Sequence, residues 1–269
     1  MGPPRVDRVP LLKLDPGLLE EARGVLEAAT RIVVLTGAGV SAESGVPTFR
    51  GAGGLWKEYR AQELATPEAF ARDPRLVWEW YSWRRDLVAE CLPNAAHDAL
   101  ARLALRPAGG VTLVTQNVDG LHHRAARAVA GSDAPEAAYP LEVHGAIHRD
   151  RCPACGHMDE DPGPVDATSL DTLPRCVGCS SLVRPDVVWF GEALDPGVIG
   201  AAFAAAEEAD VCLVVGTSAL VYPAASVPDV TRGSGGAVIE VNLEPTPLTP
   251  SARATILGPS GDVLPLRLA

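Results

Sequence analysis

Short runs of β-branched and aliphatic residues alternate with longer segments in which apolar residues recur at every third or fourth position. Each run has the length and the unbroken apolar character of a strand that is buried on both faces. The runs are residues 32–35, 111–114, 211–215 and 237–241. The periodic segments predict helices over residues 15–30, 74–91, 95–105, 197–208 and 222–230. This alternation predicts an α/β fold in which helices cover both faces of a parallel sheet.

Two parts of the chain lack this pattern. Residues 1–14 contain three prolines and little periodicity, so we expect a flexible N-terminus. Residues 145–187 are rich in Pro, Gly and Asp, which indicates a small module inserted into the sheet domain. The expected large domain therefore consists of residues 15–144 and 188–269. The Ala- and Pro-rich residues 125–140 are expected to form a loose connection.

Composition excludes several classes of protein. The chain of 269 residues carries 23 Lys and Arg against 34 Asp and Glu, a net charge of −11, which disfavours binding to nucleic-acid phosphates. No stretch reaches the roughly 18 unbroken apolar residues of a membrane helix, and the N-terminal residues lack the apolar core of a signal peptide. We therefore expect a soluble, cytoplasmic protein, taken as a monomer, that binds neither nucleic acid nor membrane.

Four of the six cysteines form two pairs, Cys152-x-x-Cys155 and Cys176-x-x-Cys179, with 20 residues between them. This spacing is typical of a tetrahedral zinc site in which each pair forms one knuckle. Four thiolates leave no position for a water ligand, so the zinc is expected to be structural and to compensate for a small core. A zinc ribbon can also bind nucleic acid, but the surrounding Asp and Glu residues argue against this function. The other two cysteines lie in apolar stretches and are expected in the core.

A glycine-rich turn, Gly37-Ala38-Gly39-Val40-Ser41-Ala42, follows the first predicted strand and has the G-x-G-x-x-A spacing of a dinucleotide-binding turn. Glycines in such a turn let the backbone approach a pyrophosphate. A tight turn without a ligand shows the same pattern, and no acidic residue ends a strand about 20 residues later. The continuation over residues 43–51 is too polar for a core and places an aromatic residue and an arginine beside the turn, which favours the binding site.

Polar or glycine-containing segments also follow the other predicted strands. They are Thr115-Gln116-Asn117, Gly216-Thr217-Ser218 and Asn242. Ligands of open α/β sheets bind at the carboxyl ends of the strands, so we expect these segments and the glycine turn to line one crevice.

The predicted helix 74–91 carries Arg84 on a broad apolar face, beside Trp80, Tyr81, Leu87 and Val88. A guanidinium in such surroundings requires an anion or access to water. A salt bridge to a distant carboxylate, snorkelling to solvent and an anionic ligand each satisfy this requirement.

Taken together, these motifs resemble the sirtuin family of NAD-dependent protein lysine deacylases over nearly the whole chain. The matching segments are residues 37–41, 45–50, 116–119, 143–145, the two cysteine pairs, 188–192 and 216–218. The resemblance implies a Rossmann-like NAD-binding domain with a small zinc module. Within the family, the chain is similar to the class III type, which removes succinyl, malonyl or glutaryl groups.

The resemblance also implies the reaction. The amide oxygen of the acyl-lysine attacks C1′ of the nicotinamide ribose and expels nicotinamide, and His144 then acts as the general base that activates a ribose hydroxyl. The products are nicotinamide, free lysine and O-acyl-ADP-ribose. Imidazole suits this step because its pKa is about 6.5. By composition alone, His144 does not differ from a surface histidine such as His122, His123, His148 or His157.

Further site residues follow from the matched positions. Gln116, Asn117 and Asp119 are expected to hold the ribose and the carboxamide of NAD beside His144. The other expected NAD contacts are Gly37, Ala38, Gly39, Ser41, Ala42, Glu43, Pro47, Thr48, Phe49, Arg50, Trp56, Val118, Gly216, Thr217, Ser218, Asn242, Leu243, Glu244 and Ser260. The expected peptide-binding segment, which pairs with the substrate as an added strand, is Val188, Trp189, Phe190, Gly191 and Glu192.

Three positions bear on the acyl group. Tyr81 and Arg84 match the pair by which class III sirtuins hold an acyl carboxylate, and Ala65 matches the small residue that widens their acyl pocket. We therefore expect an enzyme that removes acidic acyl groups from lysine side chains of proteins, with NAD as co-substrate and a structural Zn²⁺. The alternatives are a general lysine deacetylase, a protein ADP-ribosyltransferase, a Rossmann oxidoreductase and a non-catalytic zinc-ribbon module.

Overall fold

A six-stranded parallel sheet forms the centre of the larger part of the molecule, in the order β11-β10-β9-β1-β4-β5. The computed structural model describes residues 15–47, 55–56, 59–106, 110–131 and 134–266, so the N-terminal segment expected to be flexible lies outside it. The strands are β1 (Ile32–Thr36), β4 (Val111–Thr115), β5 (Leu141–Glu142), β9 (Val211–Val215), β10 (Ala237–Asn242) and β11 (Ala254–Leu257). The predicted α/β fold with a parallel sheet is confirmed.

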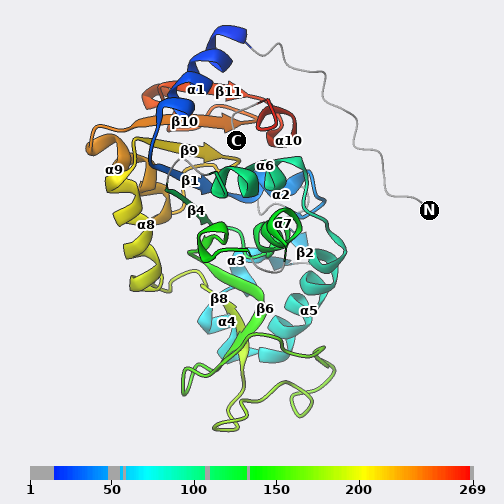
Figure 1. Cartoon of the computed structure of the whole chain (residues 1–269). Helices are drawn as coiled ribbons and strands as arrows, with labels where there is room; N and C mark the ends of the chain where they lie inside the picture. Colours follow the sequence, from blue (N-terminus) through cyan, green and yellow to red (C-terminus); the bar gives the residue numbers. More distant parts are fainter. Residues whose placement is uncertain (1–14, 48–54, 57–58, 107–109, 132–133, 267–269) are drawn as a thin grey trace, which may run out of the picture.

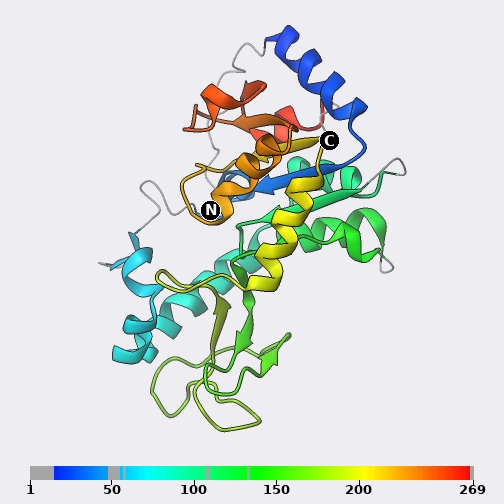
Figure 2. The ribbon, with the colours of Figure 1, turned by 90° about the vertical axis from the view of Figure 1, so that its left-hand side faces the viewer.

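Helices cover both faces of the sheet (Figures 1 and 2). They are α1 (Pro16–Ala28), α2 (Ala38–Ala42), α6 (Ala95–Ala104), α7 (Leu121–Ala130), α8 (Pro196–Glu208), α9 (Val227–Gly233) and α10 (Ser260–Val263). Side chains of β1 alternate between two cores, as the period of a strand requires. Ile32 and Val34 contribute to the core shared with α1, α6 and α10, whereas Val33 and Leu35 contribute to the core shared with α8 and α9. Burial on both faces explains the unbroken apolar runs in the sequence.

The order of the strands reverses beside β1. From β1 the chain proceeds to β4 and β5 on one side, and it then returns to add β9, β10 and β11 on the other side. A crevice forms outside the carboxyl ends of the strands at such a switch point, because the connections on its two sides diverge. The topology therefore predicts a ligand site where the loops after β1 and β9 meet.

A smaller group of elements forms a separate hydrophobic core. Its elements are α3 (Ala61–Leu64), α4 (Pro67–Arg72), α5 (Pro74–Glu90), β6 (Gly145–Arg151), β7 (Met158–Asp159) and β8 (Arg184–Val187). The three strands form an antiparallel sheet in the order β7-β6-β8. Trp78 and Tyr81 of α5 share one cluster with Cys152, Leu173 and Trp189. We call residues 61–90 and 145–192 the small region, and the six-stranded sheet with its helices the sheet region.

Figures 1 and 2 both show β6 and β8 extending from the six-stranded sheet to the loops of the small region, with α4 and α5 beside them. A short hairpin of β2 (Leu55–Trp56) and β3 (Tyr59–Arg60) precedes α3. Within the described ranges, no helix combines the length and the apolar character needed to cross a membrane.

Two sequence-based expectations are corrected. The helix predicted over residues 222–230 is divided into the 3-10 turn η3 (Ala224–Ser226) and α9, because Pro228 lies in the first turn of a new helix, where its missing N–H is tolerated. Residues 125–140 are not a loose connection throughout, since α7 continues to Ala130 and η2 spans Glu136–Ala138. Ala125 and Ala126 of α7 are fully buried, and the helix packs closely against α6. A third 3-10 turn, η4 (Thr249–Ser251), precedes β11.

Candidate active site at the switch point of the sheet

Three glycines bring two backbone segments into direct contact at the switch point. The N–H of Gly39, in α2, donates to the carbonyl oxygen of Gly216, after β9, over 2.7 Å. A Cβ atom on Gly37 would lie 2.9 Å from that oxygen, and one on Gly39 would lie 2.7 Å from it. Gly216 itself has φ of 59°, in the left-handed region that favours glycine. Only glycine fits these positions, and the resulting bare backbone at the start of α2 suits a pyrophosphate.

The residues after β4 are tied to this turn through their side chains. The Gln116 amide donates to the hydroxyl of Thr217 over 2.9 Å. The Asn117 amide donates to the carbonyl of Gly37 over 3.0 Å and to the hydroxyl of Ser41 over 3.1 Å. The turns after β1, β4 and β9 therefore form one hydrogen-bonded polar cluster at the carboxyl edge of the sheet, where the sequence predicted that they meet.

Asp119 lies beside Ser41 of this cluster and is buried, with 5% of its surface exposed. Burial raises the pKa of Asp119, while hydrogen bonds from the Leu121 N–H and from Ser41, together with the charge of Arg84, act in the opposite direction. Val118, between the predicted NAD contacts Asn117 and Asp119, is buried in the core of the small region. Asp119 thus interacts with Ser41 at the glycine turn and with the charge of Arg84 in the predicted acyl pocket.

His144 lies between β5 and β6, where the chain passes from the sheet region into the small region. Its Nδ1 is 2.9 Å from the carbonyl oxygen of Gln116. A carbonyl only accepts, so Nδ1 carries the proton and the Nε2 lone pair of the neutral ring is available as a base. Burial lowers the pKa of His144, and the hydrogen bond to Gln116 partly opposes this effect. The imidazole is therefore held in the neutral form near pH 7.

The segment Val188–Glu192 follows β8 and is fixed by its backbone beside His144. The N–H of Val188 donates to the carbonyl of His144 over 2.9 Å, and the N–H of Phe190 donates to the carbonyl of Ala65 over 2.9 Å. Gly145 permits this approach, because its φ is 77° and a Cβ would lie 2.1 Å from the carbonyl oxygen of Asp186. The fold thus brings the predicted base, the predicted peptide segment and the predicted acyl-pocket alanine together. Gly191 has φ of 88° and is exposed.

Tyr81 and Arg84 lie one turn apart on α5, on the side of the small region that faces this segment. Tyr81 is fully buried, and its hydroxyl oxygen accepts a hydrogen bond from the indole of Trp189 over 2.8 Å. Arg84 is half-buried, with its guanidinium carbon 4.9 Å from the centre of the Trp80 ring and 5.8 Å from that of Tyr81. Burial lowers the pKa of Arg84, and the neighbouring Tyr81 and Asp119 oppose this effect.

Further residues predicted to contact NAD lie at the ends of the next strands and beside α2. The Asn242 amide donates to the carbonyl of Thr217 over 2.7 Å. The hydroxyl of Ser260 donates to the carboxylate of Glu43 over 2.9 Å, which joins α10 to the end of α2. The other residues predicted here are located as follows: Ala38 within α2, exposed Ala42 at its end, half-buried Ser218 after β9, and exposed Leu243 and Glu244 after β10.

Part of the predicted NAD contact lies outside the described residues. Thr48, Phe49 and Arg50 belong to that part. Trp56 lies on the short strand β2, and its side chain is not described. Pro47 is half-buried at the end of the described segment that follows α2. The roles of these residues stay predictions.

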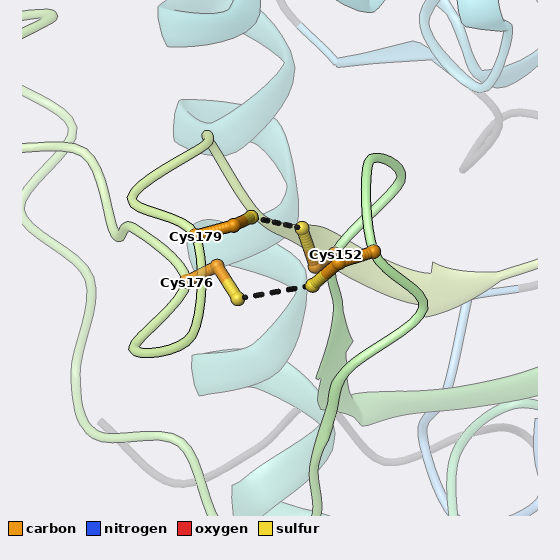
Figure 3. A group of neighbouring side chains, drawn as sticks. Cys152, Cys176 and Cys179 are labelled. Carbon is orange, nitrogen blue, oxygen red and sulfur yellow. Dashed lines mark hydrogen bonds between the residues drawn. The ribbon is translucent and has the colours of Figure 1, made fainter.

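The four predicted zinc ligands form one cluster at the base of the small region (Figure 3). Their sulfur atoms all lie within 4.8 Å of one another, and Cys152–Cys179 and Cys155–Cys176 are each 3.5 Å apart. These separations exceed the about 2 Å of a disulfide and agree with the roughly 3.8 Å edge of a tetrahedron of Zn–S bonds of about 2.3 Å. The cluster therefore fits a structural Zn²⁺. Cys91 and Cys212 are buried, as expected.

Both cysteine pairs have the same knuckle geometry. In the first knuckle, the N–H of Gly156 donates to the carbonyl of Cys152, and in the second the N–H of Ser180 donates to that of Cys176, over 2.9 and 2.8 Å. Gly156 and Ser180 occupy equivalent positions and both have positive φ, 75° and 61°. The serine therefore adopts a backbone conformation that glycine adopts at lower cost.

Sequence reasoning missed a buried polar network under the glycine turn. His97, which is fully buried, lies with Nε2 3.3 Å from the hydroxyl of Ser41, and burial lowers its pKa to about 4. His122 is also buried rather than on the surface, with Nε2 3.0 Å from the hydroxyl of Thr36. Burial lowers the pKa of His122 well below its ordinary value. Both histidines lie on amphipathic helices, and their local sequence gives no signal that separates a buried histidine from an exposed one.

Comparisons with known proteins agree with this geometry. The Sir2 family profile matches residues 37–223. A Pyrococcus furiosus protein named NAD-dependent protein deacylase is 48% identical over 252 residues, which cover 92% of this chain and 96% of that protein. A Thermus thermophilus protein of the same name is 50% identical over 241 residues, which cover 88% of this chain and 89% of that protein.

Solved structures of the same family share the fold. The crystal structure of a Sir2 homologue in complex with NAD is 44% identical, with a TM-score of 0.83 and coverage of 93% of this chain and 92% of the other. A mutant Sir2 homologue with 2′-O-acetyl ADP ribose has a TM-score of 0.80 at 45% identity, over 94% and 95% of the two chains. A Sir2–p53 peptide–NAD⁺ complex has a TM-score of 0.76 at 29% identity, over 92% and 95%. This chain belongs to the Sir2 family.

Proposed function

We propose that the chain is an NAD-dependent protein lysine deacylase that prefers succinyl-, malonyl- or glutaryl-lysine. The observation that carries the proposal is the position of His144, whose Nδ1 is held by Gln116 and whose backbone carbonyl accepts from Val188. One residue thereby joins the NAD turn to the predicted peptide segment. The deacylase name of relatives nearly half identical to this chain, and the NAD and 2′-O-acetyl ADP ribose in related structures, support the same activity.

The glycines at the switch point suit the pyrophosphate of NAD because a side chain there would fill the space that the backbone leaves. Bound NAD supplies an electrophilic ribose carbon and nicotinamide as a leaving group. Gln116, Asn117 and Asp119 are proposed to orient the nicotinamide ribose, since Gln116 bonds to Thr217, Asn117 bonds to Gly37, and Asp119 is buried beside Ser41. In this division, residues 15–144 and 188–269 bind NAD, and residues 145–187 hold the zinc.

His144 is proposed as the general base. Its protonated Nδ1 faces the Gln116 carbonyl, so Nε2 is free to take a proton from a ribose hydroxyl. The buried position of the ring keeps the imidazole neutral at physiological pH, which is the form that a base requires. The Nδ1 hydrogen bond also fixes the orientation of the ring relative to the hydroxyl.

The acyl preference rests on Tyr81, Arg84 and Ala65. Arg84 lies beside two aromatic rings on α5, and Ala65 is connected to the peptide segment through Phe190. The small side chain of Ala65 leaves room for a longer acyl group, and the guanidinium offers paired donors to its terminal carboxylate. An acetyl group has no such carboxylate.

The test is NAD-dependent turnover of one peptide that carries acetyl-, succinyl- or malonyl-lysine, with mass spectrometry of the peptide and of the ADP-ribose product. We expect O-acyl-ADP-ribose and a preference for the acidic acyl groups. A preference for acetyl-lysine would retain the mechanism and overturn the acyl assignment. Labelled protein in place of O-acyl-ADP-ribose would indicate an ADP-ribosyltransferase, reduced NAD would indicate an oxidoreductase, and no turnover would contradict the proposal.

Replacement of Arg84 tests the acyl assignment directly. Arg84→Met should lower kcat/KM for desuccinylation by about 10- to 100-fold, the value of a charged hydrogen bond, and deacetylation far less. Arg75→Met, a charge removal at an exposed position of the same helix, is the matched control and should leave the ratio of the two activities unchanged. Equal losses of both activities in Arg84→Met would exclude a specific contact with the acyl carboxylate.

Acylated-lysine proteins are the proposed substrates, as the peptide complex of a relative supports. The net charge of −11 favours proteins over nucleic acids, and we propose no role for a membrane. We propose a cytoplasmic location, since free thiols such as Cys91 and Cys212 suit a reducing compartment. The proposed oligomeric state is a monomer. Light scattering of the purified chain measures the oligomeric state.

A further inference from the structure

The indole of Trp189 connects the peptide segment to the predicted acyl pocket. Its Nε1–H donates to the hydroxyl oxygen of Tyr81 over 2.8 Å, and both side chains are buried. An indole N–H only donates, whereas a phenolic hydroxyl both donates and accepts. Because Trp189 supplies the donor in this bond, the Tyr81 hydroxyl proton is directed to another acceptor.

Trp189 is held in place by two charged residues, Arg184 and Glu192. The guanidinium carbon of Arg184 lies 3.5 Å from the centre of the indole ring. Arg184 also donates two hydrogen bonds to the carboxylate of Glu192, over 2.6 and 2.7 Å, and Glu192 accepts the backbone N–H of Trp189 over 2.8 Å. The ring and the backbone of Trp189 are therefore fixed by the same ion pair.

The hydrogen bond from Trp189 to Tyr81 is more specific than packing in a hydrophobic core requires. Phe70 also contacts the indole, with ring centres 5.4 Å apart, and a phenylalanine at position 189 would preserve most of such packing. It would not donate a hydrogen bond to Tyr81. The Tyr81 hydroxyl would then be free to rotate and to act as acceptor or as donor.

We propose that Trp189 is a positioning residue for acyl selection, which acts by fixing the Tyr81 hydroxyl as a donor. The guanidinium carbon of Arg84 lies 5.8 Å from the centre of the Tyr81 ring. This end of the predicted pocket then presents two kinds of donor, the Tyr81 hydroxyl and the Arg84 guanidinium. Paired donors select an acyl terminus that carries acceptor oxygens, a carboxylate, over one that ends in a methyl group. The inference rests on the acyl preference proposed above and assigns part of it to residues that do not themselves touch the acyl group.

The experiment is a double-mutant cycle with Trp189→Phe and Tyr81→Phe. The measured quantity is the ratio of kcat/KM for a succinyl-lysine peptide to that for the acetyl-lysine form of the same peptide. Each single variant should lower this ratio about tenfold. The double variant should lower it no further than either single variant, because both substitutions remove the same oriented donor.

Trp78→Phe is the matched control. The indole of Trp78 lies in the same cluster and donates to the carbonyl of Val183 over 3.0 Å, so its loss has a comparable cost in stability without affecting Tyr81. This control should leave the ratio at the wild-type value. Should Trp189→Phe not fold, Arg184→Lys provides the same test, since lysine lacks the planar group that stacks on the indole, and the ratio should fall about threefold.

Three results would overturn the inference: a Trp189→Phe variant with the wild-type ratio, independent and multiplicative effects of the two substitutions, or an equal fall of the ratio in Trp78→Phe. Failure of the proposed function has a different signature. In that case the wild-type chain itself does not deacylate any peptide, or it prefers acetyl-lysine.

Discussion

The sheet region and the small region achieve their stability in different ways. In the sheet region, β1 and β9 consist entirely of buried residues, and each face of the sheet packs on its own helices. In the small region, β7 has two residues, both exposed, and the strands are joined by loops that converge on four cysteines. Aromatic side chains join aliphatic ones in its core, and a charged group packs on one of them, in the contact of Arg184 with Trp189.

This difference shows that the two regions support the site in different ways, one by burial and the other with the help of a metal. Extensive burial makes the sheet region a rigid support for the glycine turn. Between Cys152 and Leu173 the chain has no buried residue, and a bound metal can supply the missing stability. The site lies at the junction, where His144 connects β5 to β6 and Arg85 of α5 donates to the carbonyl of Ile147 on β6 over 2.6 Å.

Removal of zinc gives the largest expected effect and separates the two regions. Binding of structural zinc is linked to about 10–16 kcal/mol of apparent folding energy in small zinc domains, so a chelator or Cys155→Ser should unfold the cysteine loops and abolish deacylation. Hydrogen exchange should then increase across residues 145–187 while β1, β9 and β10 stay protected. Cys91→Ser should retain one zinc per chain, and equal loss of protection in both regions would contradict the comparison.

Substitution of His144, at the junction, should strongly lower the rate of deacylation without altering the structure of either region. His144→Ala should reduce kcat for deacylation by about 10²- to 10⁴-fold, the usual contribution of a general base, with an unchanged melting temperature. His148→Ala, which removes an exposed histidine from β6, should keep its activity.

The pH dependence of wild-type kcat/KM tests the same residue. Burial lowers the pKa of His144 from 6.5, and the neutral ring is the active form. The acidic limb of kcat/KM should therefore have its midpoint below pH 6.5. An acidic limb with its midpoint above 6.5 would exclude His144 in this environment as the titrating base.

A methyl group at the glycine turn should disturb the sheet region where two backbone segments are in direct contact. Gly39→Ala places a Cβ 2.7 Å from the carbonyl oxygen of Gly216, which should cost about 1–3 kcal/mol in the free energy of unfolding and weaken NAD binding. Gly24→Ala, in α1 with open space around it, should instead increase stability by up to about 1 kcal/mol. Urea unfolding and calorimetric titration with NAD measure both. Unaltered NAD affinity in Gly39→Ala would contradict the proposed pyrophosphate site.

The smallest expected effect distinguishes the two zinc knuckles. Ser180→Gly should stabilise the zinc-bound small region by about 1 kcal/mol, because it removes the cost of a non-glycine residue at φ of 61°. The reciprocal change Gly156→Ser should destabilise it by a similar amount. Thermal unfolding in the presence of zinc reports both changes, and a gain in stability from Gly156→Ser would show that the knuckles are not equivalent.

Much of the sheet region was predictable because its signals are local. The runs at residues 32–35 and 211–215 lie within β1 and β9, since a strand buried on both faces leaves an unbroken apolar pattern. The two-residue strand β5 carries no such signal. The continuation of α7 was missed because it depends on packing against α6, whereas the break before α9 has a local cause in Pro228.

The candidate site was predictable as a set of residues rather than as a geometry. Spacing identified the four cysteines, and the motif identified the glycine turn, because both require particular residue types at fixed separations. The contact of Trp189 with Tyr81 was not predictable, since it joins residues 108 positions apart.

The sequence by itself therefore determined the α/β class, the metal ligands and the family resemblance, because periodicity and motif spacing are properties of neighbouring residues. The tertiary structure alone decided which histidines are buried, which nitrogen of His144 carries the proton, and which donors surround Tyr81. These features depend on side chains that distant segments bring together. Burial and hydrogen-bond partners then set their charge and direction, and neither is encoded in any local pattern.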